Sequence, residues 1–80
     1  MPEEVLFKSE EQVSRGEIAE SLRNAADQID SGDVTVGNDA DEQRVTVPDS
    51  PRFEVELERL TDSETGEQRY ELEYEIRWKE

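Results

Sequence analysis

The clearest pattern in the chain is a helical stripe of apolar residues. It recurs at spacings of four, three and four, through Ile18, Leu22, Ala25 and Ile29, which places these side chains on one face of an α-helix. Ser14 and Glu17 stand three residues apart just before the stripe, as in a capping box, where the serine hydroxyl accepts the later N–H. Gly32 suits the left-handed conformation that ends many helices. The pattern predicts a helix over residues 15–31.

Three short segments alternate between apolar and polar residues, as strands do. They are residues 3–11 around Val5 and Phe7, residues 33–36 with two valines, and residues 44–47 with two more. A polar loop begins at Gly37 and separates the second segment from the third. Pro48 and Pro51 follow the third segment and interrupt the strand pattern, because proline donates no hydrogen bond to a β-ladder.

Two longer segments alternate strictly and are joined by a short loop that contains Gly66. The first runs from Phe53 to Glu58 and the second from Tyr70 to Trp78, which predicts a β-hairpin. Closure of the turn near residues 63–66 places Leu57 opposite Leu72. Glutamates then face each other in three pairs: Glu58 with Glu71, Glu56 with Glu73, and Glu54 with Glu75.

These elements predict one α+β domain over residues 1–80, in the order β-α-β-β-β-β. We expect one helix packed on the apolar face of a mostly antiparallel sheet of four to five strands, because an amphipathic helix and a one-sided sheet each need an apolar partner. The consistency of the alternation argues against a disordered chain.

Composition then narrows the possible chemistry. The chain has 23 acidic and 9 basic residues, a net charge of −14, and neither histidine nor cysteine. A disulfide framework, a Cys/His zinc site, a thiol nucleophile and an imidazole base are therefore excluded. The longest apolar run is residues 5–7, far too short to cross a membrane. Such a negative surface repels phosphates, so nucleic acid is not an expected partner.

The acidity also indicates a habitat. Acidic residues are spread along the whole chain, and only Lys8 and Lys79 among the basic residues are lysines. Molar salt shortens the Debye length to about 3 Å and so screens the mutual repulsion of the carboxylates. An evenly acidic, lysine-poor surface resembles that of haloarchaeal cytoplasmic proteins, and we expect a cytoplasmic protein of a halophile.

The order of the segments resembles one known family. The capped helix that begins at Ser14, the Val47-Pro48-Asp49 step, the Glu-rich strand from Phe53 and the amphipathic strand that ends at Trp78 together are similar to the amphi-Trp domain, a small family common in haloarchaea. The resemblance covers almost the whole chain. It implies the domain boundaries and the habitat, and it implies no particular reaction or cofactor.

The carboxylates have several possible roles. The six glutamates of the hairpin form a face that, in a different class of function, would act as an acidic charge mimic or bind cations through oxygen ligands. Asp39, Asp41 and Glu42 come nearest to a calcium loop, but their spacing does not match one. A catalytic carboxyl needs a desolvated cleft, and one helix on one sheet offers little depth. We therefore expect no enzyme, no metal site and no cofactor.

The aromatic strand remains. Leu72, Tyr74 and Ile76 are expected in the core, because alternating apolar residues of a sheet are usually buried. A 17-residue helix is about 26 Å long and does not cover an 11-residue strand of about 36 Å, so Tyr70 or Trp78 is expected at an uncovered rim. Exposed aromatic side chains anchor interfaces. The sequence thus favours a small interaction module that binds a protein partner or itself through Trp78 and Tyr70.

Overall fold

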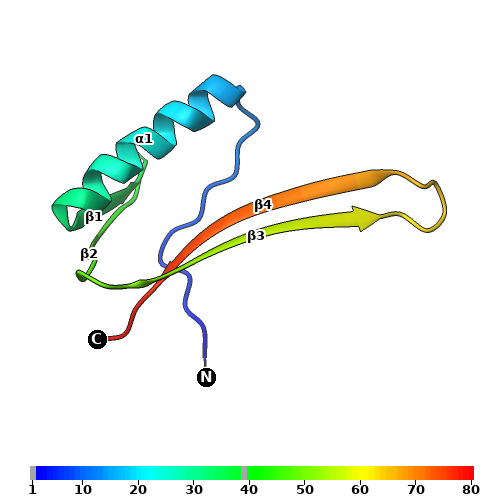
Figure 1. Cartoon of the computed structure of the whole chain (residues 1–80). Helices are drawn as coiled ribbons and strands as arrows, with labels where there is room; N and C mark the ends of the chain where they lie inside the picture. The colour runs from blue at the N-terminus through cyan, green and yellow to red at the C-terminus, as the bar shows by residue number, and fades with distance from the viewer. Residues whose placement is uncertain (1, 39) are drawn as a thin grey trace. The chain divides into compact units, whose positions relative to one another are not determined.

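The computed structural model describes residues 2–38 and 40–80, with one helix and four strands in this part of the chain (Figure 1). They are α1 (Arg15–Ser31), β1 (Asp33–Gly37), β2 (Glu42–Thr46), β3 (Arg52–Thr61) and β4 (Gln68–Arg77). The α+β class expected from the sequence is confirmed. The chain divides into two compact units, residues 1–49 and residues 50–80, and each is described by itself.

Helix α1 has the predicted ends. The Ser14 Oγ accepts a hydrogen bond of 3.1 Å from the Glu17 N–H, which satisfies one of the free donors at the helix start. The reciprocal bond, from the Ser14 N–H to the Glu17 carboxylate, is not among the hydrogen bonds of the described residues. At the other end Gly32 has φ 95° and donates to the carbonyls of Gln28 and Ile29, so it ends the helix as expected.

The first unit continues into a short hairpin that lies against the helix (Figure 1). Strands β1 and β2 pair antiparallel, with Val34 opposite Val45. The Gln28 side chain of α1 accepts a 2.7 Å hydrogen bond from the Thr35 N–H, which ties the helix to β1. Val47 donates to the Gly32 carbonyl at 2.7 Å and is the one buried hydrophobic residue in the described part of the chain.

The second unit is the long hairpin of β3 and β4 (Figure 1). The two ten-residue strands pair antiparallel over their whole length. Leu57 lies opposite Leu72, and the three predicted glutamate pairs are present. The predicted register is therefore confirmed.

Two expectations about the sheet were wrong. Residues 3–11 contain no strand, and Val5 is 70% exposed. The four strands form two separate two-stranded sheets within residues 2–38 and 40–80, whereas one sheet of four to five strands was expected. Two alternating apolar residues are too few to hold a strand in register. Pro48 and Pro51 interrupt the chain between β2 and β3, which favours pairing within each hairpin.

Candidate functional site

The candidate site is the apolar side of the β3–β4 hairpin, called here the apolar hairpin face. Because side chains alternate between the two sides of a sheet, the register places one group of residues on this face: Phe53, Val55, Leu57, Tyr70, Leu72, Tyr74 and Ile76. All of them except Ile76 are exposed, by between 53% and 69%. Leu72 and Tyr74 were expected in the core; the hairpin itself leaves both exposed, and Ile76 is half-buried.

The turn between the strands sets the register of the face. The Asp62 carboxylate accepts hydrogen bonds from the N–H groups of Glu64 (2.8 Å) and Thr65 (3.2 Å), and these bonds lower the pKa of Asp62. The Asp62 N–H donates to the Glu67 carbonyl at 2.8 Å. Gly66 adopts φ 76°, a conformation that glycine reaches without strain. The loop thus fixes which residues of β3 and β4 face each other.

The two aromatic rings near the open end of the hairpin are ordered against each other. Phe53 and Tyr74 stack with ring centroids 6.2 Å apart and planes 10° from parallel. They occupy diagonal positions of the ladder, since Phe53 pairs with Ile76 and Tyr74 with Val55. Stacking of this kind holds the rings in one orientation, so that part of the face presents a defined surface.

The sequence singled out Tyr70 and Trp78 as anchors. Tyr70 is 63% exposed and its hydroxyl lies 3.2 Å from Gln68 Oε1, to which it donates. Trp78 follows the last residue of β4 and is half-buried. Sequence reasoning missed the exposure of Phe53, Val55 and Leu57. The signal for it was present in their strict alternation with glutamates, but a pattern of this kind does not tell whether anything covers the apolar side.

The opposite side of the hairpin is acidic. Its register holds three glutamate pairs, Glu54 with Glu75, Glu56 with Glu73, and Glu58 with Glu71, called here the glutamate ladder. Repulsion raises the pKa of Glu56, first from Glu58 and then from Glu73. Like charges directly opposite each other destabilise a strand pair, so the ladder works against the hairpin that carries it.

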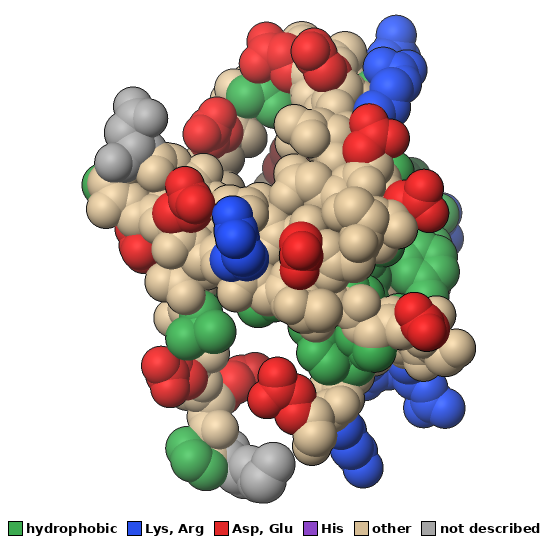
Figure 2. Space-filling model, turned by 90° about the vertical axis from the view of Figure 1, so that its left-hand side faces the viewer, with side chains coloured by type: hydrophobic (Ala, Val, Ile, Leu, Met, Phe, Trp, Pro, Cys, Tyr) green, Lys and Arg blue, Asp and Glu red, His purple; other side chains and the backbone are tan. Residues whose placement is uncertain are grey.

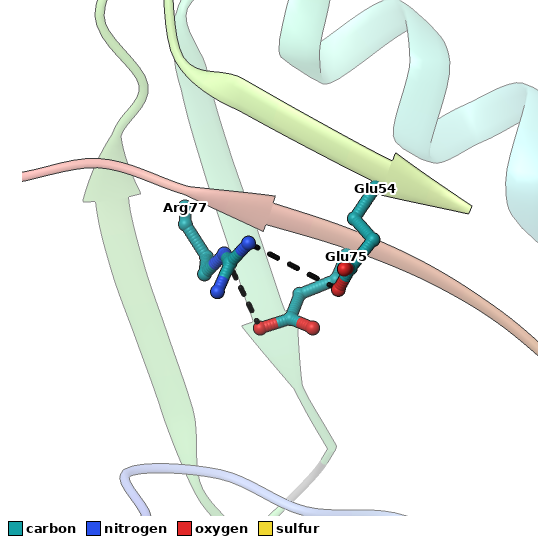
Figure 3. Close-up of polar contacts among 3 residues, drawn as sticks. All are labelled: Glu54, Glu75 and Arg77. Atoms are coloured by element: carbon teal, nitrogen blue, oxygen red, sulfur yellow. Dashed lines mark ion pairs between the residues drawn. The ribbon is translucent and has the colours of Figure 1, made fainter. Parts of the chain in front are cut away.

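Arg77 reduces the repulsion between carboxylates at one end of the glutamate ladder. Its guanidinium lies 3.7 Å from a carboxylate oxygen of Glu75 and 4.0 Å from one of Glu54, on the neighbouring strand (Figure 3). All three side chains are about half exposed, and ion pairs of this kind contribute little to stability. Glu56, two positions further along β3 from Glu54, has no such cation within salt-bridge distance in the described residues, and repulsion raises its pKa.

Other features of the described residues offer little chemistry. A shallow depression at the turn is lined by Leu60, Thr61, Asp62, Glu67 and Arg69, and a second lies along the start of α1. Residues 2–38 and 40–80 hold no group of three or more acidic residues placed to bind a metal ion. Asp39, part of the calcium-loop comparison, lies outside the described residues. In the described chain, no helix has the length and apolar character that crossing a membrane requires.

Apolar side chains are also exposed in the first unit. Ile18 and Leu22 of the helical stripe are 49% and 51% exposed, and Ile29 is 36% exposed. Figure 2 shows hydrophobic side chains among acidic ones on the visible surface. These helical residues form a narrow stripe along α1, whereas the apolar hairpin face is broader, because neighbouring positions of two paired strands contribute to it. The hairpin face is therefore the stronger candidate.

Comparison with known proteins gives one match. The family model of the Amphi-Trp domain matches residues 1–80, the whole chain. Neither curated proteins nor solved structures show significant similarity to it. The match covers the capped helix, both hairpins and the amphipathic last strand that ends before Trp78. This chain belongs to the Amphi-Trp domain family.

Proposed function

We propose that the chain is a small non-enzymatic interaction module that binds protein, another copy of itself or a different chain, through the apolar hairpin face. The observation that supports this is the exposure of six large apolar side chains, each by more than half, on one side of one hairpin. Contiguous apolar patches of this size mark interaction sites on soluble proteins.

The energetics of the hairpin support the same proposal. A two-stranded hairpin without a covering layer is marginally stable in water, and here the glutamate ladder weakens it further. Covering the apolar face contributes roughly 25 cal/mol for each Å² removed from water. Binding to a partner therefore supplies stabilisation that the isolated hairpin lacks.

We also propose that the module works in the salt-rich cytoplasm of a halophile. The net charge of −14 and the raised pKa of Glu56 both reflect repulsion that molar salt screens. Screening also lets an acidic chain approach another acidic protein, which at low salt it would repel.

A second candidate function uses the other side of the hairpin. The glutamate ladder places six carboxylates on one side of the hairpin, and the negative potential that raises the pKa of Glu56 attracts cations. Titration with Mg²⁺ in molar KCl distinguishes this role from general screening. A saturable heat signal that Glu56→Gln reduces would support a cation-binding protein, whereas no saturable signal is expected if salt acts only by screening.

The test of the main proposal uses two neighbouring residues with opposite placement. The tagged chain, Leu72→Gln and Glu73→Gln are used as baits for untagged protein from a halophilic lysate in molar KCl. Leu72 lies on the apolar hairpin face and Glu73 on the glutamate ladder. We expect the wild type and Glu73→Gln to retain protein and Leu72→Gln to lose it. Equal retention by all three baits would contradict the proposal.

A further inference from the structure

We propose that the apolar hairpin face is covered by the same face of a second copy of the chain, in a symmetric dimer. This inference rests on the proposed function and names the partner. The two hairpins would pack as two layers, as sheets in a sandwich do, with their apolar side chains between them. An interface of this kind uses the same residues on both copies.

Length is the first argument for a second copy. The ten-residue strands β3 and β4 are about 33 Å long. An identical hairpin matches the face from end to end.

Charge is the second argument. The strict alternation places all six glutamates of the ladder on the side away from the apolar hairpin face. Within the paired strands, Arg59, opposite Tyr70, is the charged residue in register with the apolar face. Two copies of the chain that meet through this face keep both ladders on the outside, in the salt solution. It is the one side of the hairpin on which two strongly acidic chains approach without opposing their carboxylates.

Area is the third argument. Six side chains of the face are exposed by 53–69%. At roughly 150 Å² for each side chain, they expose roughly 500 Å² per copy. Complete burial of two such faces removes about 1,000 Å² of these side chains from water, about the area that separates a biological interface from a chance contact. Ile76 and the Arg59 stem, at the margins of the face, add to this area.

The mass of the purified chain tests the dimer. Sedimentation equilibrium in molar KCl is expected to give twice the chain mass of 9.2 kDa. Leu72→Gln is expected to weaken dimerisation roughly 100-fold, because the lost apolar contact occurs twice in a symmetric interface. Glu73→Gln, on the opposite side of the same strand, is expected to dimerise as the wild type does.

Cysteine cross-linking tests the face independently of those variants. The chain has no cysteine, so Leu57→Cys and Glu56→Cys each provide a single thiol, on the apolar face and on the ladder respectively. With a short bismaleimide, each of whose two maleimides adds one free thiol, we expect two Leu57→Cys chains to be linked far more readily than two Glu56→Cys chains. Equal linkage of the two variants would overturn the face-to-face arrangement.

Two results separate this inference from the proposed function. A folded wild-type chain that stays at 9.2 kDa across the concentration range overturns the dimer. If the Leu72→Gln bait still loses protein from the lysate in that case, the interaction module survives with a different partner. A folded monomer whose bait retains nothing contradicts both.

Discussion

Single residues at the ends of the helix and strands determine where these elements begin, end or turn. Ser14 accepts the Glu17 N–H at the start of α1, and Gly32 ends the helix with φ 95°. Asp62 accepts two backbone N–H groups in the hairpin turn. Each of these residues fixes the direction of the chain with one or two hydrogen bonds, in a protein whose described residues bury very little.

The helix cap gives a prediction for Ser14→Ala. Loss of the hydroxyl leaves the Glu17 N–H without its partner, and we expect the free energy of unfolding to fall by about 0.5–2 kcal/mol. Ser21→Ala, within the same helix, is the matched control and should be neutral or slightly stabilising, because alanine has the higher helix propensity. Chemical denaturation in molar KCl measures both. Equal stability of the two variants would show that the cap contributes nothing.

Glu56 gives a prediction for pH. Its pKa in the folded chain is raised above the ordinary 4.5 by its glutamate neighbours, so the folded state binds this proton more tightly than the unfolded state. Stability must therefore rise as the pH falls from neutral through the folded pKa toward 4.5. Thermal melts at low salt should show this rise, and Glu56→Gln should reduce it. A melting temperature that falls steadily over this pH range would contradict the repulsion.

Protonation of Asp62 has the opposite effect on stability, and it occurs at lower pH. Hydrogen bonds from Glu64 and Thr65 lower its pKa below the ordinary 3.8, so its carboxylate stabilises the folded turn at higher pH. This contribution is lost as the pH falls below 3.8 through the folded pKa. The melting temperature should therefore pass through a maximum and decline in stronger acid, and Asp62→Asn should decline less. A decline of the same size in both proteins would exclude the turn as its source.

At the scale of elements, local patterns predicted most of what formed. The stripe of Ile18 and Leu22 and the Ser14 cap gave the helix, and strict alternation with a glycine turn gave the register of β3 and β4. Each of these features depends on interactions between residues that are close in the sequence, within one helix or across one loop. The strand expected around Val5 did not form, because a strand also needs an edge to pair with, and sequence alternation alone does not provide one.

The candidate site was predicted only in part, for a related reason. The alternation showed which side of the hairpin is apolar and placed Tyr70 on it. Whether Leu72 and Tyr74 are covered depends on another element or another chain, and nothing in their own segment decides it. The glutamate ladder, in contrast, followed directly from the register, because facing positions are fixed once the turn is fixed.

Two glycines give a prediction for the first unit. A Cβ at Gly37 would lie 2.7 Å from the Glu42 Cα, a backbone atom of the facing strand, so Gly37→Ala should destabilise the β1–β2 hairpin by about 1–3 kcal/mol. At Gly16 a Cβ meets only the Ser14 Oγ at 3.9 Å, and Gly16→Ala should stabilise α1 by about 0.4–1 kcal/mol. Denaturation of both variants checks the pair, and a tolerated Gly37→Ala would contradict the close approach of β1 and β2.

At the scale of the whole molecule, charge and exposed apolar surface act together. The net charge of −14 opposes both folding and association in dilute buffer, where the Debye length is about 30 Å at 0.01 M salt. The exposed apolar face favours association. Molar salt screens the repulsion, so that the apolar contact between two copies determines whether they associate.

Stability is therefore expected to rise with KCl and to fall sharply below about 0.1 M, where screening fails. Glu56→Gln and Glu3→Gln each remove one negative charge, but Glu56 belongs to the ladder and Glu3 to the irregular N-terminal segment. The first variant should depend less on salt than the second. Melting curves in a KCl series measure this. A wild-type melting temperature that stays the same from dilute buffer to molar salt would refute the charge argument.

The most direct measurement of the central claim is hydroxyl-radical footprinting of the purified wild type in molar KCl over a range of concentrations. If a second copy covers the apolar hairpin face, oxidation of Leu72 and Tyr74 should fall several-fold as the concentration passes through the dimerisation range. Val5, 70% exposed in the first unit, is the internal control and should be oxidised equally throughout. Rates for Leu72 and Tyr74 that stay constant at every concentration would contradict the dimer.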